Sequence, residues 1–227
     1  MGSIDVVGLG AGRFGLLTLE ALDKIEQAQY LFLRTEQHPT VSGLKARGIN
    51  FAAYDAFYQE AENFAELYER IAQDLVKKAR AGMRLVYAVP GSPVVAEKTV
   101  RRLRELCAEE DIPLHIYPGM SFLEILCTEL QIDPIEGVTI VDAEDIDRLP
   151  ADLKTSWVVT QIYNQRTASL AKLSLMNFFS DEYLVTYVHN LGLPDVSIRQ
   201  IPLYELDRQK DIDHLTSLYV PKKTKRR

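Results

Sequence analysis

Hydrophobic residues recur at helical spacing in one long segment of the chain, from Phe64 to Arg80. Apolar side chains there hold the i, i+3, i+4, i+7 pattern for four turns, and Gly82 follows as a helix-ending glycine would. Elsewhere in the first half, short apolar runs alternate with loops and shorter amphipathic stretches. These runs predict four strands, at Ile4 to Val7, Tyr30 to Leu33, Leu85 to Val89 and Leu114 to Tyr117. Strands separated by helices indicate a largely parallel sheet.

The second half has a different pattern, with four strands and a single clear helix. We expect that helix from Arg166 to Met176, and strands at Val138 to Val141, Trp157 to Thr160, Leu184 to Val188 and Val196 to Ile201. Strands that outnumber helices favour a mixed or antiparallel sheet. The chain is therefore predicted to be α/β, with one domain over residues 1–115, a second over 116–206, and residues 207–227 outside both.

Composition describes an ordinary globular protein, with 47% hydrophobic and 26% charged residues. No apolar run reaches the roughly 20 residues of a membrane helix, and the start lacks a signal-peptide pattern, so a cytoplasmic protein is expected. Cys107 and Cys127 fall at apolar helix positions and are expected to be reduced and buried. Five of the last six residues are basic, so the rest is more acidic than the net charge of −6, which disfavours nucleic acid as a partner.

Three short loops rich in Gly and Pro follow predicted strands of the first half: "GLGAG" at 8–12, "PGSP" at 90–93 and "PGMS" at 118–121. Ligands of open α/β sheets bind beyond the carboxyl ends of the strands, where such loops present rigid backbone groups. No Gly-Lys-Ser/Thr sequence is present, so a nucleoside triphosphate is poorly supported. The four histidines are scattered without ligand spacing, so no metal site is expected.

The first loop also matches the GxGxxG spacing of a dinucleotide fold, from Gly10 to Gly15. In that fold the helix begins inside the glycine loop, whereas the best helix cap here is Thr18, six residues past Gly12. A nicotinamide-dependent oxidoreductase is therefore disfavoured. Rigid loops without phosphate-binding groups suit an adenosine with a neutral or cationic tail; the alternative is that all three are only tight turns.

Three segments in this order, "VVGLGAGRFGLLTLEAL", "YAVPGSPVVAEKTVRRL" and "IYPGMSFLEIL", resemble the tetrapyrrole (corrin/porphyrin) methylase family. The resemblance covers roughly Ile4 to Leu206 and extends to the methylase domain of YabN-like proteins and to borosin peptide N-methylases. It implies the two-domain fold of these class III methyltransferases, S-adenosylmethionine as cofactor, a small-molecule substrate and a homodimer. In YabN-like proteins a MazG-type nucleotide pyrophosphohydrolase follows, so residues 207–227 would be the linker toward it.

Carried over position by position, the resemblance implies a cofactor site. Its residues are Leu9, Gly10, Pro90, Ser92, Val95, Ala96, Ser121, Phe122, Gln161, His189, Asn190, Pro202 and Leu203. Ser92 stands where the family's GDP motif has Asp. The Arg and Tyr thought to aid deprotonation in borosin enzymes align with Glu60 and with Phe64 or Ala65, which disfavours peptide amide methylation. Among the tyrosines expected near the cleft, Tyr58 is the predicted catalytic residue.

Two functions follow from the resemblance. The leading one is a methyltransferase whose acceptor, tetrapyrrole-like or another small molecule, is unidentified. The alternative is a cofactor-binding regulatory module attached to a MazG-type pyrophosphohydrolase.

Overall fold

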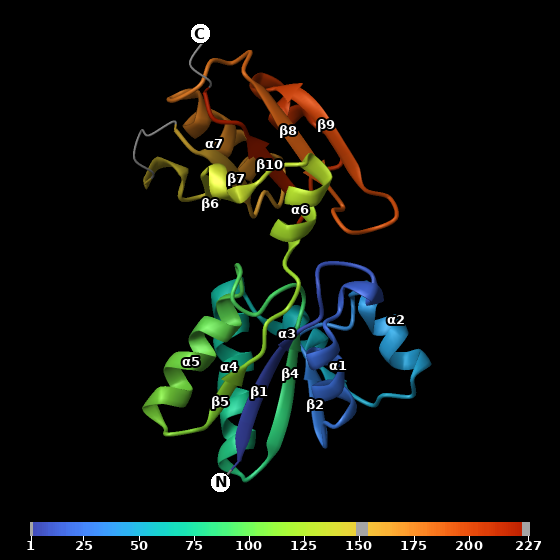
Figure 1. The fold of residues 1–227 in the computed structure, drawn as a ribbon. Helices are drawn as coiled ribbons and strands as arrows, with labels where there is room; N and C mark the ends of the chain where they lie inside the picture. Colours follow the sequence, from blue (N-terminus) through green and yellow to red (C-terminus); the bar gives the residue numbers. More distant parts are fainter. Residues whose placement is uncertain (1, 149–153, 224–227) are drawn as a thin grey trace. The chain divides into compact units, whose positions relative to one another are not determined.

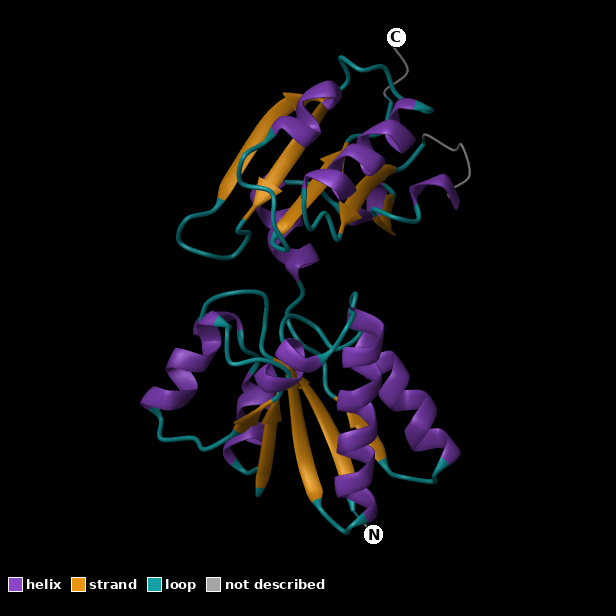
Figure 2. Cartoon of the chain, turned by 180° about the vertical axis from the view of Figure 1, so that it is seen from behind, coloured by secondary structure: helices purple, strands orange, loops and turns teal. Residues whose placement is uncertain are grey.

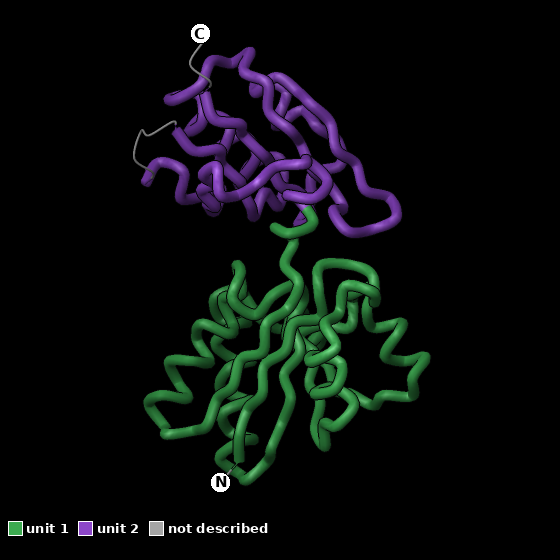
Figure 3. Tube along the Cα trace, viewed as in Figure 1, with its two compact units in different colours: residues 1–125 green, residues 126–227 purple. Residues whose placement is uncertain are grey.

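The computed structural model describes residues 2–148 and 154–223 of the chain, and it divides into two compact units (Figure 3). The first unit comprises residues 1–125 and the second residues 126–227. The sequence places the boundary ten residues earlier, after residue 115. The difference has a physical reason, because the loop at 118–121 packs its glycine against two other glycines of the first unit.

A five-stranded parallel sheet in the order β3-β2-β4-β1-β5 forms the centre of the first unit (Figure 1). All four neighbouring pairs are parallel, which confirms the prediction of a parallel sheet. β4 lies in the middle and is buried on both faces, as its unbroken apolar run predicts. The strands are β1 (Ser3–Gly8), β2 (Tyr30–Leu33), β3 (Ala52–Ala53), β4 (Arg84–Val89) and β5 (Leu114–Ile116).

Helices cover both faces of this sheet, and each face has its own apolar core. One core includes α4 and α5, and the other includes α1 and α2. The Thr18 side chain caps α1 by accepting a hydrogen bond from the Ala21 N–H, and Gly82 follows α4 with a φ of +96°, both as predicted. The helices are α1 (Leu19–Glu26), α2 (Pro39–Ala46), α3 (Asp55–Glu60), α4 (Phe64–Arg80) and α5 (Lys98–Glu109), with a 3₁₀ turn at Phe14–Leu16.

The second unit contains a mixed sheet in the order β6-β7-β10-β8-β9, seen with its helix in Figure 2. β6 and β7 are parallel, β10 is antiparallel to both β7 and β8, and β9 is antiparallel to β8. The mixed sheet is confirmed. The strands are β6 (Val138–Asp142), β7 (Ser156–Thr160), β8 (Leu184–His189), β9 (Ser197–Pro202) and β10 (Thr216–Val220). The helices are α6 (Phe122–Leu130), which begins in the first unit, and α7 (Gln165–Met176), with 3₁₀ turns at Pro134–Glu136, Ile146–Arg148 and Leu203–Arg208.

The prediction of a linker over residues 207–227 is wrong for β10. This strand lies at the centre of the second sheet, and the side chains of Leu218 and Val220 are buried in its core. Its five residues show no clear alternation and precede a basic run, so the sequence pattern alone favours a linker. The rest of that run, residues 224–227, lies outside the described residues. In the described ranges, no helix combines the length and apolar character needed to span a membrane.

Candidate functional site

The loops after β1, β4 and β5 meet at one edge of the first unit's sheet, because these strands are neighbours and parallel. The first two loops are joined by a pair of backbone hydrogen bonds. The Gly10 N–H donates to the Gly91 carbonyl over 3.2 Å, and the Gly91 N–H donates to the Gly10 carbonyl over 2.9 Å. The loops therefore form one continuous backbone surface.

Two glycines allow this close approach. A Cβ on Gly8 would lie 2.3 Å from the Gly91 carbonyl oxygen, and a Cβ on Gly119 would lie 2.8 Å from the Gly8 Cα. Each clash is with backbone, which cannot move aside cheaply. Gly91 differs from both, since nothing lies within 4 Å of its Cβ position while its φ is +68°. The surface of the three loops is thus tightly packed on its inner side and open at Gly91.

The first unit brings together most of the cofactor residues that the resemblance implies, though not as equal contacts. The Leu9 side chain is fully buried in the core, so only its backbone follows the loop surface. Ser92 and Ser121 are also buried. The Ser121 hydroxyl accepts from the Leu123 N–H over 2.9 Å, and Glu124 accepts from the Ser121 N–H over 3.0 Å, a reciprocal cap of α6. Ser121 therefore fixes the start of that helix.

Left-handed backbone conformations coincide with the predicted site. Ala96, Gln161 and Asn190 have φ values of +56°, +63° and +56°, and all three are predicted cofactor residues. The other non-glycine residues of positive φ in the described ranges, Asp111 and Gln131, follow the ends of α5 and α6, where this conformation is common. None of Ala96, Gln161 and Asn190 follows a helix, and left-handed backbone outside helix C-termini is often found at functional sites.

Two residues that the sequence does not single out hold the first loop in place. The buried Thr40 hydroxyl lies 3.0 Å from both the Leu9 and the Gly12 carbonyl oxygens. The His38 ring accepts a hydrogen bond from the Thr40 N–H through Nδ1, and burial lowers its pKa to about 4, with the nearby Arg34 charge adding to the effect. A neutral His38 is required for this cap, because a protonated Nδ1 cannot accept. No sequence motif indicates either role.

An ion pair with a buried carboxylate, Glu97, lies in the same unit. Arg34 follows β2 and its guanidinium donates to the Glu97 carboxylate over 2.7 Å. Tyr58, the predicted catalytic residue, lies on α3 with 37% of its surface exposed and interacts electrostatically with Arg34. Burial raises the pKa of Tyr58, so its phenol is protonated at neutral pH and can donate a hydrogen bond.

The second unit places its predicted residues at two different edges. Gln161 and Asn190 follow the carboxyl ends of β7 and β8, which run in the same direction. Pro202 pairs with Leu184 at the opposite end of β8, and Leu203 is fully buried in the core. The structure therefore does not bring Pro202 and Leu203 to the edge that carries the other predicted residues of this unit.

His189 and Asn190 are held by neighbouring carboxylates. The His189 Nε2 lies 3.1 Å from Asp213, and the Asn190 amide donates to Asp195 over 2.6 Å. These contacts use polar side chains rather than backbone groups. Asn190 is half-buried, whereas His189 is buried.

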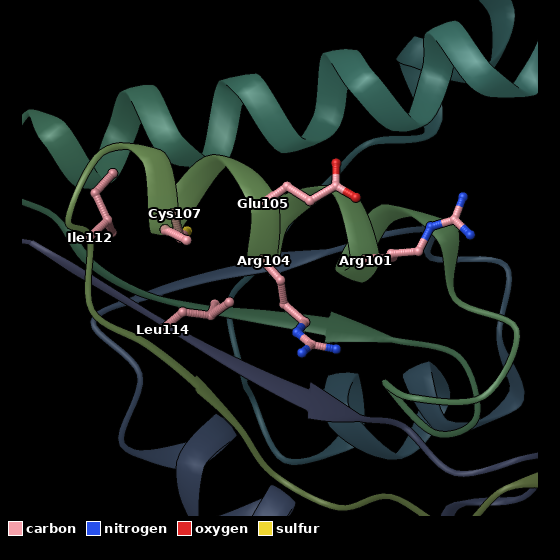
Figure 4. A pocket seen from close by; sticks show the side chains of 7 residues that line it. Arg101, Arg104, Glu105, Cys107, Ile112 and Leu114 are labelled. Carbon is pink, nitrogen blue, oxygen red and sulfur yellow. The ribbon is translucent and has the colours of Figure 1, made fainter.

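Other sites receive less support. The glycine loop leads into a 3₁₀ turn and α1 begins only at Leu19, which is not the geometry of a pyrophosphate turn. Within the described ranges, no group of three His, Cys, Asp or Glu residues could hold a metal ion. A shallow hollow on α5 is lined by Arg101, Arg104, Cys107 and Leu114, among others (Figure 4). Leu114 begins β5, so the hollow lies toward the edge opposite the three loops.

This chain matches only part of the length of each curated relative. The protein YabN of Bacillus subtilis, described as uncharacterized, is 40% identical over 97% of this chain and 45% of its own. The dendrothelin A precursor methyltransferase of Dendrothele bispora is 26% identical over 71% of this chain and 39% of its own. This chain thus spans less than half the length of these relatives.

Solved structures show the fold. A uroporphyrin-III-C-methyltransferase from Thermus thermophilus matches with a TM-score of 0.75 at 20% identity, covering 98% of this chain and 95% of that one. The methyltransferase CobJ also gives 0.75, at 15% identity, with 100% and 97% coverage. The family model of the tetrapyrrole (corrin/porphyrin) methylases, which use S-adenosylmethionine as methyl donor, matches residues 3–207. The chain therefore belongs to the tetrapyrrole methylase family.

Proposed function

We propose that this chain is an S-adenosylmethionine-dependent methyltransferase whose cofactor lies against the three loops of the first unit. The observation that carries the proposal is the joined backbone surface of Gly8, Gly10, Gly91 and Gly119, on which the Cβ position of Gly91 faces open space. Tight turns without a ligand would not need three separate loops to converge so closely. Ala96, which lies with Gly91 between β4 and α5, has a left-handed backbone conformation and adds support.

The residues suit a cofactor that brings its own reactivity. S-adenosylmethionine supplies a methyl group already activated by its sulfonium, so the protein must hold the acceptor in line and exclude water. Backbone N–H and C=O groups can bind adenosine and the amino acid tail without a phosphate-binding side chain. Tyr58 would contribute a protonated phenol that donates a hydrogen bond to the acceptor.

Binding and turnover are tested separately. Calorimetry with S-adenosylhomocysteine is expected to give a dissociation constant in the micromolar range, about −7 to −9 kcal/mol. NADH serves as the matched control and is expected not to bind. Millimolar or weaker binding of S-adenosylhomocysteine, together with tighter binding of NADH, would overturn the proposal. Isotope-labelled cofactor, incubated with the protein and a cell extract, then identifies the acceptor by mass spectrometry.

A second candidate is a cofactor-binding module that regulates an attached MazG-type pyrophosphohydrolase. It is favoured by the length of the YabN relative, of which this chain covers only 45%. In this case S-adenosylhomocysteine binds, no labelled methyl group is transferred, and the cofactor changes the pyrophosphohydrolase rate of the full-length protein. Methyl transfer with no such rate change would exclude it.

The homodimer that the resemblance implies is also part of the proposal. Sedimentation at tens of micromolar protein is expected to give twice the chain mass of 25.7 kDa. A single species at the mass of one chain would contradict it.

A further inference from the structure

The hollow on α5 lies beside an open edge of the first unit's sheet. β5 stands last in the strand order, so one of its edges has no neighbouring strand among the described residues. The Pro113 carbonyl and the Tyr117 N–H each bond to β1 over 2.9 Å. Backbone groups alternate in direction along a strand, so the N–H and C=O groups of Leu114 and Ile116 point away from β1. Such outward backbone groups are a template for pairing with another strand.

The side of this edge that faces α5 is apolar at one end and basic at the other. Leu114 and Ile116 pack on the core that contains α5, and Leu114 also lines the hollow. Figure 4 shows Ile112 and Leu114 at one end of the hollow and Arg101 toward the other, and Arg104 lies between these ends. Side chains alternate between the two faces of a strand, so a strand added to β5 would direct every second side chain toward this hollow.

Two exposed arginines that line the hollow, Arg101 and Arg104, make no ion pair within residues 2–148 and 154–223. The neighbouring Glu105 is paired instead with Arg102 over 3.0 Å. The hollow therefore favours a ligand that brings its own carboxylates, which form strong charge-assisted hydrogen bonds with guanidinium groups. A second copy of this chain would bring the same two arginines to the interface, and like charges brought together there are unfavourable.

We propose that this edge of β5 and the hollow on α5 bind an extended segment of a partner protein, which adds to the sheet as a strand and directs carboxylates toward Arg101 and Arg104. Main-chain hydrogen bonds to β5 would supply affinity, and the side-chain contacts would supply selectivity. The inference goes beyond the proposed function, because this surface lies away from the three loops.

The spacing of the two arginines fits a strand. They lie about 4.5 Å apart along the helix axis, and alternate residues of a strand lie about 6.6 Å apart, so two successive side chains on one face can reach both. An apolar side chain two positions beyond these carboxylates would meet Ile112 and Leu114. The partner segment is therefore expected to carry one apolar and two acidic residues at every second position.

The probe is an end-capped peptide of sequence Val-Thr-Glu-Thr-Glu-Thr-Val, which reads the same in both directions and so suits either strand orientation. NMR follows its binding to this chain through the backbone amide signals of Leu114 and Ile116. The peptide is expected to shift both signals saturably, in the high micromolar range. A peptide with lysine in place of both glutamates is expected to bind at least tenfold more weakly.

Two protein variants test the charge. Arg104→Glu should weaken the glutamate peptide at least tenfold and strengthen the lysine peptide, while the affinity for S-adenosylhomocysteine stays within twofold. Arg166→Glu is the matched control, because Arg166 is exposed on α7 of the second unit and has no ion pair in the part of the chain that the structure describes. Thermal unfolding checks that both variants fold. Equal losses of peptide affinity in the two variants would overturn the inference.

Two N-methylated peptides test the strand pairing. One is methylated at the backbone nitrogens of both glutamates, and the other at those of the two threonines that precede the glutamates. Only one of them should lose binding, because alternate N–H groups of a strand face its neighbour. Loss of binding in neither peptide or in both would overturn the pairing with β5.

Other occupants of this surface give different results. Inorganic phosphate that shifts the Leu114 and Ile116 signals as far as the glutamate peptide does would indicate a site for small anions and contradict the inference. Conversion of a dimer to a single chain by Arg104→Glu, measured by sedimentation, would assign the surface to a second copy and also contradict it. Neither outcome affects the proposed function, which is tested by S-adenosylhomocysteine binding without any peptide.

Discussion

The strand ends of the two units present different chemistry. In the first unit the surface at the carboxyl ends is built from backbone, with Gly8 and Gly119 packed so closely that no Cβ fits. In the second unit the corresponding edge of β7 and β8 carries polar side chains, with His189 and Asn190 held by Asp213 and Asp195. Backbone held by glycine is rigid and tolerates no change, whereas exposed side-chain networks tolerate substitution. The two units should therefore respond differently to equivalent mutations.

The largest expected difference lies between removing a carboxylate from a buried ion pair and removing one from a half-exposed hydrogen-bonded contact. Glu97→Ala leaves the largely buried Arg34 charge without its partner and should cost about 3–5 kcal/mol of stability. Asp213→Ala removes a carboxylate that is 46% exposed and should cost about 1 kcal/mol or less. Denaturant unfolding measures both, and the fluorescence of Trp157, the single tryptophan, reports on the second unit. Equal losses in the two variants would contradict the comparison.

The second difference concerns the inner side of the loop surface. Gly8→Ala places a Cβ 2.3 Å from the Gly91 carbonyl oxygen and should destabilise the protein by about 2–4 kcal/mol. Gly15→Ala is its matched control on the same loop, because nothing lies within 4 Å of its Cβ position, and should be nearly neutral. Thermal unfolding distinguishes them. A stable Gly8→Ala protein would show that the loops are less tightly packed than described.

A smaller effect is expected for one buried threonine hydroxyl in each unit. Thr40→Val removes the hydroxyl between the Leu9 and Gly12 carbonyls and should cost about 1–2 kcal/mol. It should also weaken S-adenosylhomocysteine binding, because the first loop loses its support. Thr160→Val removes one longer bond, 3.3 Å to the Val141 carbonyl, and should cost less. A larger loss of stability in Thr160→Val than in Thr40→Val would contradict this prediction.

The last expected effect depends on pH. Burial and the Arg34 charge lower the pKa of His38 to about 4, whereas the unfolded chain titrates near the ordinary 6.5. Between these values the unfolded state binds more protons than the folded state. The contribution of neutral His38 to the free energy of unfolding is therefore complete above about pH 6.5 and is lost as the pH falls toward 4. The loss should be on the order of 1–3 kcal/mol. Denaturant unfolding at pH 7 and pH 4.5 measures this loss. His38→Asn can keep the cap and should reduce the dependence of the free energy of unfolding on pH. An unchanged pH dependence in this variant would contradict the prediction.

The sequence predicts the elements whose pattern is strong. The helix at Phe64–Arg80, the cap at Thr18 and the buried strand β4 are all present, since long periodic segments and glycine signals are local properties. It does not predict α2, α3 or β10. α2 has a mixed apolar pattern and begins at Pro39 behind a histidine cap, and β10 buries two polar residues, Thr216 and Ser217, beside Leu218. Such elements depend on tertiary packing.

For the candidate site too, the sequence predicts the features with a local signal and misses those that depend on tertiary packing. Backbone loops are visible in sequence, because Gly and Pro are needed where loops meet, and the three loops do meet. The pair of Arg34 and Glu97 joins residues 63 positions apart and matches no motif. His38 and Thr40 likewise act through contacts with a distant loop. Pairwise contacts of this kind arise from the fold, so a single sequence does not reveal them.

The most direct measurement compares two glycine substitutions by S-adenosylhomocysteine calorimetry. Gly91 and Gly82 both have positive φ, +68° and +96°, and both have open space at the Cβ position. Gly91 lies on the loop surface, whereas Gly82 precedes β4 at the opposite edge of the sheet. A valine at either position strains the backbone by about 1–3 kcal/mol.

If the cofactor lies against the loop surface, Gly91→Val and Gly82→Val should lose similar stability, while only Gly91→Val loses affinity for S-adenosylhomocysteine, by at least tenfold. Equal affinities in the two folded variants would contradict the account, because the open position at Gly91 would then be a turn without a ligand.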